Sequence, residues 1–250
     1  MLFKQTVLTN QALVMQRALD YVSKGYGLWT SGSIHLPKAF KLAQKFDLIY
    51  DIGADRNKRQ RKKTLDQGNA IALWWLPKED SLDIHWWLFV SLNGEHPAKK
   101  TEQLRNASTP TGRLRIGAYE LVLIPTKSPN PKPCTLTWRF TKSGYESWRS
   151  TLRSMVRNHT PRHLVSDRLH ALFAAPGFRG IRQQIGKATA FYRSEWKRVR
   201  GNEEMPKPPR HLGYIRRLPT TGLSLYSVSE SAKLMAQAQA QNFQNQGVAE

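Results

Sequence analysis

This sequence has one cysteine, few acidic residues and no long apolar run, and each shortage excludes a class of protein. Cys134 alone cannot form an internal disulfide or supply a multi-cysteine zinc module, and it fits a reducing compartment. The segment MLFKQTVLTNQ lacks the apolar stretch of a secretory signal, and no segment approaches the roughly 20 apolar residues that span a bilayer. We therefore expect a cytoplasmic protein with no membrane partner.

The shortage of acids leaves a large positive charge. Eighteen Asp and Glu face 39 Lys and Arg, which gives a formal net charge of +21 in 250 residues. Such an excess repels itself in the compact state, so it favours a polyanionic partner. Ribosome association, anionic membrane surfaces and acidic proteins are alternatives, but membrane-surface helices need a strongly apolar face that is free. Here the apolar faces are expected to be used in a core, so we expect nucleic acid, DNA or RNA, as the partner.

Apolar residues are plentiful enough for a substantial core. They make up 40% of the chain and include eight Trp, eight Tyr and nine Phe. Apolar residues recur at helical spacing over 10–24 and from Pro37 to Tyr50. The stretch 28–36 between them is mixed in character, and an extended conformation is one interpretation of it. We predict an α+β protein in which N-terminal helices flank an antiparallel sheet of about four strands, followed by a C-terminal three-helix region.

A hairpin is predicted over 69–92, where two apolar strands flank the polar sequence PKEDSLD. Symmetric pairing places Trp75 opposite Trp86 and Trp74 opposite Trp87, so that each face carries one Trp pair. Core packing of both pairs is the simpler interpretation, because large aromatic side chains dominate cores. Display of one pair on the surface is the alternative.

A second hairpin is predicted over 118–140, with the turn-rich sequence PTKSPNPKP between its strands. Pairing Leu121 with Trp138 gathers apolar side chains on one face and sets Glu120 opposite Arg139 on the other. Opposite charges at facing positions support this register. One face is then buried and the other is at least partly in water.

The segments around the second hairpin differ in character. Residues 93–117 are turn-rich, hold five bases and are expected to form a mobile loop. After Thr141, helical spacing predicts three helices, the last of which runs to about Arg200. Ser143 is expected to cap the first of them, in a capping box with Glu146.

Four regions follow from these patterns. Residues 1–140 form the mixed region of helices and sheet, and 141–200 form a basic helical region continuous with the same core. The Pro-rich segment 201–226 is expected to be extended. An Ala/Gln-rich helical tail occupies 227–250 and begins at a second capping box with Ser227 as its cap; it either frays or binds a protein partner.

The bases gather in two parts of the chain. Residues 56–63 (RNKRQRKK) hold six bases and no acid, and we expect them on an exposed loop or frayed helix. Residues 139–217 hold 18 bases against five acids, with arginines at intervals of four on one helix and a second row on the last helix. Each row alone is typical of a solvated face, but together they favour a surface that follows a phosphate backbone. The expected nucleic-acid-binding residues are Arg56, Lys58, Arg59, Arg61, Lys62, Lys63, Arg149, Arg153, Arg157, Arg179, Arg182, Arg193, Lys197 and Arg200.

Aromatic side chains near these bases are candidates for stacking on unpaired nucleobases, as in single-strand binders. Tyr26 and Trp29 are the main candidates, with packing in the protein as the simpler interpretation. The turn at Pro176 and Gly177 leads into a helix N-terminus, which would suit a backbone phosphate or simply start the helix.

Signals for catalysis are weak, and we assign no catalytic residue. His159, His163 and His170 lack the further ligands that zinc needs, so neither a metal site nor a cofactor is expected. Signatures of nucleotide-binding loops, nucleophile elbows, zinc fingers and RNA-recognition domains do not fit. A metal-independent RNA-processing endonuclease is the alternative, because one histidine beside a Lys or Arg can cleave RNA through its 2′-hydroxyl. Its histidine would be one of His35, His85 and His96.

The leading expectation is a non-enzymatic nucleic-acid-binding protein, either a DNA-binding regulatory factor or a subunit of a nucleoprotein complex. The endonuclease is the second hypothesis. A structural subunit that docks on another protein through its tail helix is the third.

Overall fold

The computed structural model describes residues 4–78, 80–125, 134–201 and 203–246. The chain divides into two compact units. Unit 1 consists of Met1–Gly112 and Leu218–Glu250, and unit 2 consists of Arg113–Arg217. Unit 2 is therefore an insertion between the two parts of unit 1.

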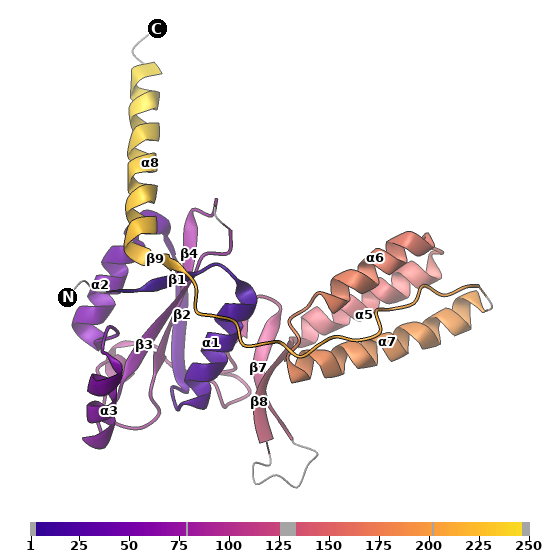
Figure 1. Ribbon diagram of the computed structural model, residues 1–250, viewed down its shortest axis with the longest axis horizontal. Coiled ribbons are helices and arrows are strands. Elements are labelled where there is room, and N and C mark those ends of the chain that lie inside the picture. The colour runs from indigo at the N-terminus through magenta and orange to yellow at the C-terminus, as the bar shows by residue number, and fades with distance from the viewer. Residues whose placement is uncertain (1–3, 79, 126–133, 202, 247–250) are drawn as a thin grey trace. The chain divides into compact units, whose positions relative to one another are not determined.

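Unit 1 is built on a mixed six-stranded sheet with the order β5-β2-β4-β3-β1-β9 (Figure 1). Its strands are β1 (Thr6–Leu8), β2 (Leu28–His35), β3 (Ala70–Trp75), β4 (Asp83–Val90), β5 (Arg105–Asn106) and β9 (Leu223–Ser224). Strand β1 runs parallel to β3, and the other neighbours are antiparallel. The expectation of one antiparallel sheet of about four strands was wrong, because the mixed stretch 28–36 supplies a central strand and the second hairpin belongs to another sheet.

Helices pack on both faces of this sheet. Helix α1 (Gln11–Ser23), which confirms the helix expected over 10–24, packs on one face, where the ring of Tyr21 lies 5.5 Å from that of Phe89. On the other face, the 3-10 turn η1 (Leu36–Lys38) leads into α2 (Ala39–Tyr50), and Phe46 contacts the rings of Trp74 and Trp86. Alternate residues of β3 therefore meet different helices, as a strand buried on both sides requires.

The register of the first hairpin differs by one residue from the symmetric pairing. Trp74 faces Trp86, and Trp75 faces His85. Beyond this pair, the amide of Leu76 bonds to the carbonyl of Leu8 in β1, on the other edge of β3. Trp74 and Trp86 then share the α2 face, while Trp75 and Trp87 stack on the other face. All four are buried or half-buried, so core packing is confirmed for both faces.

The second part of unit 1 returns to the first part along α1. The guanidinium group of Arg17 donates to the carbonyl of Leu218 at 2.9 Å and to the hydroxyl of Thr220. Strand β9 then pairs with β1, and helix α8 (Leu225–Gln246) begins with Leu225 fully buried in the core. The helix begins before Ser227, so Ser227 lies within it and the expected capping box is absent.

Residues 93–117 are structured rather than a loop. They contain α4 (Ala98–Thr101), β5 and the short strand β6 (Arg115–Ile116), and they bury His96, Ala98 and Leu114. The apolar residues in this segment were too widely spaced to give a helix or strand period, which is why the pattern predicted a loop.

Unit 2 joins a three-stranded antiparallel sheet to three helices. The elements are β6, β7 (Tyr119–Pro125), β8 (Cys134–Phe140), α5 (Lys142–Arg157), α6 (Arg162–Phe173) and α7 (Arg179–Arg200). The register of the second hairpin is confirmed: Leu121 faces Trp138 and Glu120 faces Arg139. Residues 126–133 of its expected loop lie outside the described residues.

The face of this hairpin that carries Glu120 was expected to be partly in water, but its centre is covered. Gly180 of α7 lies so close to β8 that an added Cβ would be 2.6 Å from the carbonyl oxygen of Trp138. Glu120 and Thr137 are consequently buried. A glycine at this position allows the helix and the strand to approach each other.

The cap of α5 is Thr141 rather than Ser143. The hydroxyl of Thr141 accepts from the amide of Gly144 at 3.1 Å. After α7, residues 203–222 form no helix or strand, which confirms the extended segment there. The hydroxyl of Tyr192 donates to the carbonyl of Pro206, and burial raises the pKa of Tyr192 to about 12.

In the part of the chain that the structure describes, no helix is long and apolar enough to cross a bilayer.

Candidate nucleic-acid interface

The basic segment 56–63 forms a helix, α3 (Arg56–Thr64), rather than a loop. Asp55 caps it, since its carboxylate accepts from the amide of Lys58 at 2.7 Å. Like charges at adjacent turns destabilise an isolated helix. The six bases of α3 therefore need support from outside the helix.

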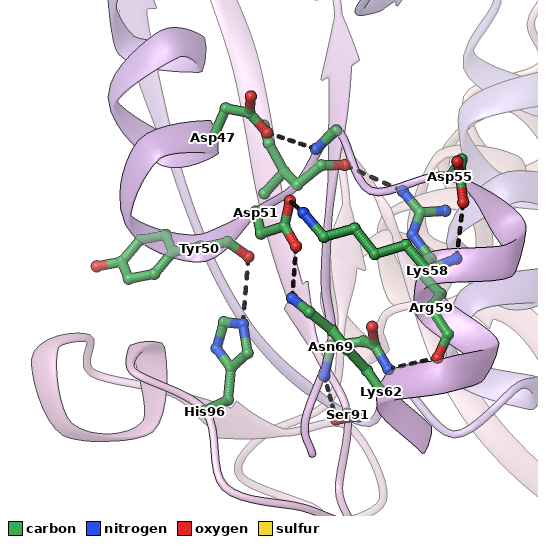
Figure 2. A network of polar contacts seen from close by, with 12 residues as sticks. Asp47, Tyr50, Asp51, Asp55, Lys58, Arg59, Lys62, Asn69, Ser91 and His96 are labelled. Carbon is green, nitrogen blue, oxygen red and sulfur yellow. Dashed lines mark hydrogen bonds and ion pairs between the residues drawn. The ribbon is translucent and has the colours of Figure 1, made fainter. Parts of the chain in front are cut away.

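Three of the bases supply that support by contacts within unit 1 (Figure 2). The ammonium groups of Lys58 and Lys62 both contact the carboxylate of Asp51, with 2.8 Å for Lys58. The Nη2 atom of Arg59 donates to the carbonyl of Ile52 at 3.0 Å. These side chains hold α3 against the end of α2 and are not free to meet a ligand with their full charge.

The carboxyl of Asp51 responds to both lysines. Burial alone raises its pKa, but the hydrogen bonds from Lys58 and Lys62 outweigh burial and hold the pKa below its ordinary value. Asp51 also has a left-handed backbone with φ 54° at the C-terminus of α2, a conformation that Asp and Asn tolerate better than most residues. Its position is therefore fixed both by the backbone and by charge.

Asn69 ties the other side of α3 to the sheet. Its Nδ2 donates to the carbonyl of Arg59 at 3.2 Å, and its backbone amide donates to the hydroxyl of Ser91 at 2.9 Å (Figure 2). The helix is thus attached to α2 at one side and to the start of β3 at another.

The other three bases of α3 take no part in these anchoring contacts. Arg56, Arg61 and Lys63 are exposed, and none forms an ion pair with any described residue. Arg56 and Lys63 also line a groove of about 870 Å³ that we call the α3 groove. Other residues along it include Lys24, Tyr26, Arg59 and Gln60.

The α3 groove is strongly basic and has an aromatic wall. Asp66 is the one acid among its described lining residues, against four bases. Tyr26 is half-buried there, with its ring 6.4 Å from that of Tyr21. Burial raises the pKa of Tyr26, so its hydroxyl stays neutral beside the bases. The sequence identified Tyr26 but missed Lys24, which only the fold brings to the groove.

In unit 2 the arginines of α5 lie against α7. The guanidinium groups of Arg149 and Arg153 lie 4.4 and 5.2 Å from the ring centre of Phe191, in cation–π geometry. Arg157 lies 3.5 Å from the carboxylate of Glu195. A hydrogen bond from Arg198, with the charge of Arg157, lowers the pKa of Glu195.

The second predicted row is on a different side of α7. Arg193 follows Phe191 by two residues, which is about 200° around an α-helix. Arg193 and Lys197 are exposed there, away from the side that meets Arg149 and Arg153. The structure therefore does not merge the two rows of unit 2 into one surface.

Two further expected residues hold the fold together. Arg179 donates to the hydroxyl of Thr135 at 2.9 Å and to the carbonyl of Pro125 at 2.7 Å. Arg182 donates to the carbonyl of Leu212 at 2.7 Å, and its guanidinium lies 3.6 Å from the ring centre of Tyr214. Their charges are used mainly inside unit 2.

Arg200 is not on the surface at all. Its side chain is 3% exposed. It donates to the carbonyls of Met155, Val156 and Thr160, each at 3.0 Å. Met155 and Val156 lie in the last turn of α5, whose final carbonyls have no helical partners, and Thr160 lies in the turn that follows. A cation is favoured at this end of a helix. Arg200 is therefore excluded from the candidate interface.

The other aromatic and histidine candidates make contacts within unit 1. Trp29 is buried and its indole donates to the carbonyl of Gly112 at 2.8 Å. His96 is buried against the carbonyl of Tyr50, and burial lowers its pKa. His85 packs against the rings of Trp75 and Trp87, and His35 lies 3.4 Å from the carboxylate of Asp83. No group of three potential metal ligands occurs among the described residues.

Comparisons with family models, curated proteins and solved structures found no match.

Proposed function

We propose that this protein binds nucleic acid through α3 and the α3 groove. The observation that supports the proposal most is the division of labour in α3, where Lys58, Lys62 and Arg59 hold the helix while Arg56, Arg61 and Lys63 stay exposed. A helix of six bases is costly to fold, and its outward charge lacks acidic partners among the described residues. A phosphate backbone supplies those partners.

The groove adds a second type of contact. Tyr26 offers an aromatic ring beside Arg56 and Lys63, and such a ring can stack on a nucleobase while the bases hold neighbouring phosphates. These contacts position the protein on nucleic acid of any sequence. A role as a DNA-binding regulatory factor or as a subunit of a nucleoprotein complex is compatible with this mode of binding.

We include Arg149, Arg153 and Arg157 as a second basic surface, on unit 2. Phe191 supports the first two guanidinium groups, so they lose less freedom when they bind a phosphate. Arg193 and Lys197 form a separate exposed pair. We do not propose the endonuclease, because no histidine is among the described residues that line the α3 groove.

The test is a charge reversal of the three exposed bases of α3 that form no ion pair with a described residue. R56E/R61E/K63E should weaken binding to duplex DNA, single-stranded DNA and RNA, and should flatten the dependence of log affinity on log salt for duplex DNA by about three units. Filter binding across a series of salt concentrations measures both quantities.

The matched control is K38E/K41E/K45E. It makes the same change in charge at three exposed lysines of η1 and α2 in unit 1. Its affinity should change much less than that of the α3 variant. Equal losses in the two variants would show that only total charge matters, and the proposed surface would be rejected.

A further inference from the structure

Unit 2 contains a cavity of about 820 Å³ whose lining converges from several elements. Arg113 precedes β6, Arg115 lies in β6, Arg139 lies in β8 and Lys142 is the first residue of α5. Residues 93–117 appeared in sequence as a basic loop, so the meeting of Arg113 and Arg115 with Arg139 could be seen only in the fold.

The charge of this cavity is positive after its ion pairs are counted. Its described lining has two acids, Glu120 and Glu146, against four bases. Glu120 is buried, and its Oε1 atom accepts from Arg139 at 2.7 Å and lies 3.8 Å from Arg113. Glu146 lies 3.6 Å from Arg149, which is outside the cavity lining. Each acid is thus already engaged, and the charged residues of the described lining sum to a formal +2.

Glu120 also orients Arg139. Both the Nε and the Nη2 atoms of Arg139 contact the same carboxylate oxygen, at 2.8 and 2.7 Å. The Nη1 atom has no partner among the described residues, and the side chain is 37% exposed. Glu120 is therefore a positioning residue that fixes one edge of the guanidinium group and leaves the other edge available.

The start of α5 adds to the attraction for anions. Thr141 caps the amide of Gly144, and Lys142, Ser143 and Gly144 all line the cavity. Amides in the first turn of a 16-residue helix favour negative charge. This effect supplements the four bases, which alone make the cavity electropositive.

We propose that this cavity binds a phosphate group. Arginine and lysine in this number, with one planar guanidinium edge free, suit a tetrahedral anion with several acceptor oxygens. The phosphate can belong to the end of a nucleic-acid strand or to its backbone. The site uses none of the residues proposed above for the α3 groove or for the arginine surface, and it lies in unit 2.

The first test uses inorganic phosphate as the probe and the full chain. Calorimetry should show that R115E/K142E binds phosphate about tenfold or more weakly than the wild type, because two charged contacts are lost. K207E is the control in the same unit and should bind phosphate as the wild type does. Lys207 is exposed, and it follows Pro206, which contacts the C-terminal half of α7. No phosphate binding by the wild type, or equal binding by R115E/K142E, would overturn the site.

The second test identifies the source of the phosphate. Oligonucleotides with a 5′-phosphate and with a 5′-hydroxyl are compared for the wild type and for R115E/K142E. A preference for the 5′-phosphate that the variant loses supports a strand end, and an equal loss for both oligonucleotides supports a backbone phosphate. Unchanged affinity for both would contradict the proposal.

Failure of this inference can be separated from failure of the proposed function. The α3 variant R56E/R61E/K63E should keep its affinity for inorganic phosphate, because the cavity is intact. If the wild type binds inorganic phosphate but no nucleic acid, the phosphate site in the cavity is supported and the proposed nucleic-acid function is rejected. If R56E/R61E/K63E abolished phosphate binding instead, the anion site would belong to α3 and the cavity would be rejected.

Discussion

At the scale of single residues, Asp51 is the acid that two bases of α3 share. Its carboxylate holds Lys58 and Lys62, and its lowered pKa records that attraction. A carboxyl with a lowered folded-state pKa stabilises the fold above its unfolded value near 3.8 and loses this effect as pH falls through the folded value. The anchoring of α3 should therefore fail in acid.

The corresponding variant is D51N, which keeps a side chain that tolerates left-handed backbone but loses the charge. We expect a lower free energy of unfolding than in the wild type. The difference between the two proteins should be constant above about pH 5, and the gap should close as the pH falls below 3.8. Urea titrations at several pH values measure it. D66N is the control, because Asp66 also has positive φ, at 51°, but forms no ion pair with a described residue. A gap that does not close in acid would disprove the role of the charge.

Arg200 and Arg198 give a second comparison. R200A removes the donor to two carbonyls in the last turn of α5 and to one in the turn after it, and should lower the free energy of unfolding by about 3 kcal/mol. R198A breaks only an exposed pair with Glu195 and should cost less than about 1 kcal/mol. Chemical denaturation followed by tryptophan fluorescence distinguishes them, and similar costs would contradict the capping role.

Sequence reasoning could identify the bases but not their uses. Arg153 and Arg200 both lie at helical positions near other arginines, yet one is exposed and the other is buried. The difference depends on where the end of α5 lies in space, which no local pattern reports. The sequence likewise could not show which bases of α3 pair with Asp51, because Lys58 and Lys62 reach its carboxylate only when α2 and α3 pack together.

At the scale of secondary-structure elements, α8 changes character along its length. Leu225 is fully buried in the core of unit 1, and the hydroxyl of Ser229 donates to the carbonyl of Pro37. Leu234, about two and a half turns of helix after Leu225, is 65% exposed. Among the side chains of α8 that the structure describes, packing against unit 1 therefore ends before Leu234.

Two substitutions in this one helix test that division. L225A should lower the free energy of unfolding by about 3 kcal/mol, because it leaves a cavity in the core. L234A should change it by less than about 0.5 kcal/mol. Thermal or urea unfolding measures both, and equal effects would contradict the packing described for α8. A deletion that tests the tail for protein binding must accordingly spare the residues before Leu234.

The predictions of secondary structure were correct where the sequence signal comes from residues close together in the chain. The register of the β7–β8 hairpin followed from facing charges at Glu120 and Arg139. The β3–β4 hairpin was displaced by one residue from the symmetric pairing. Both of its faces carry buried apolar residues, so alternation does not distinguish the two registers. Strands β1 and β9 are too short to show alternation, so their places in the sheet depend on long-range pairing that periodicity does not encode.

At the scale of the whole molecule, each unit has its own basic surface. If both surfaces hold one nucleic acid, their contributions to the binding free energy should add. R153E combined with R56E/R61E/K63E should then lose affinity equal to the sum of the separate losses, and its salt slope should fall by about one further unit. Filter binding with a long duplex measures this. A combined variant no weaker than the α3 variant would show that Arg153 is not in contact.

The insertion of unit 2 into unit 1 affects the order in which the chain can fold. During synthesis, β1 to β5 leave the ribosome first, and the whole of 113–217 follows before β9 and Leu225 exist. Until then the outer edge of β1 has no partner and the core around Leu225 is incomplete. Unit 1 is thus begun before unit 2 and completed after it, and its open strand edge is a place where a nascent chain is vulnerable to misassembly.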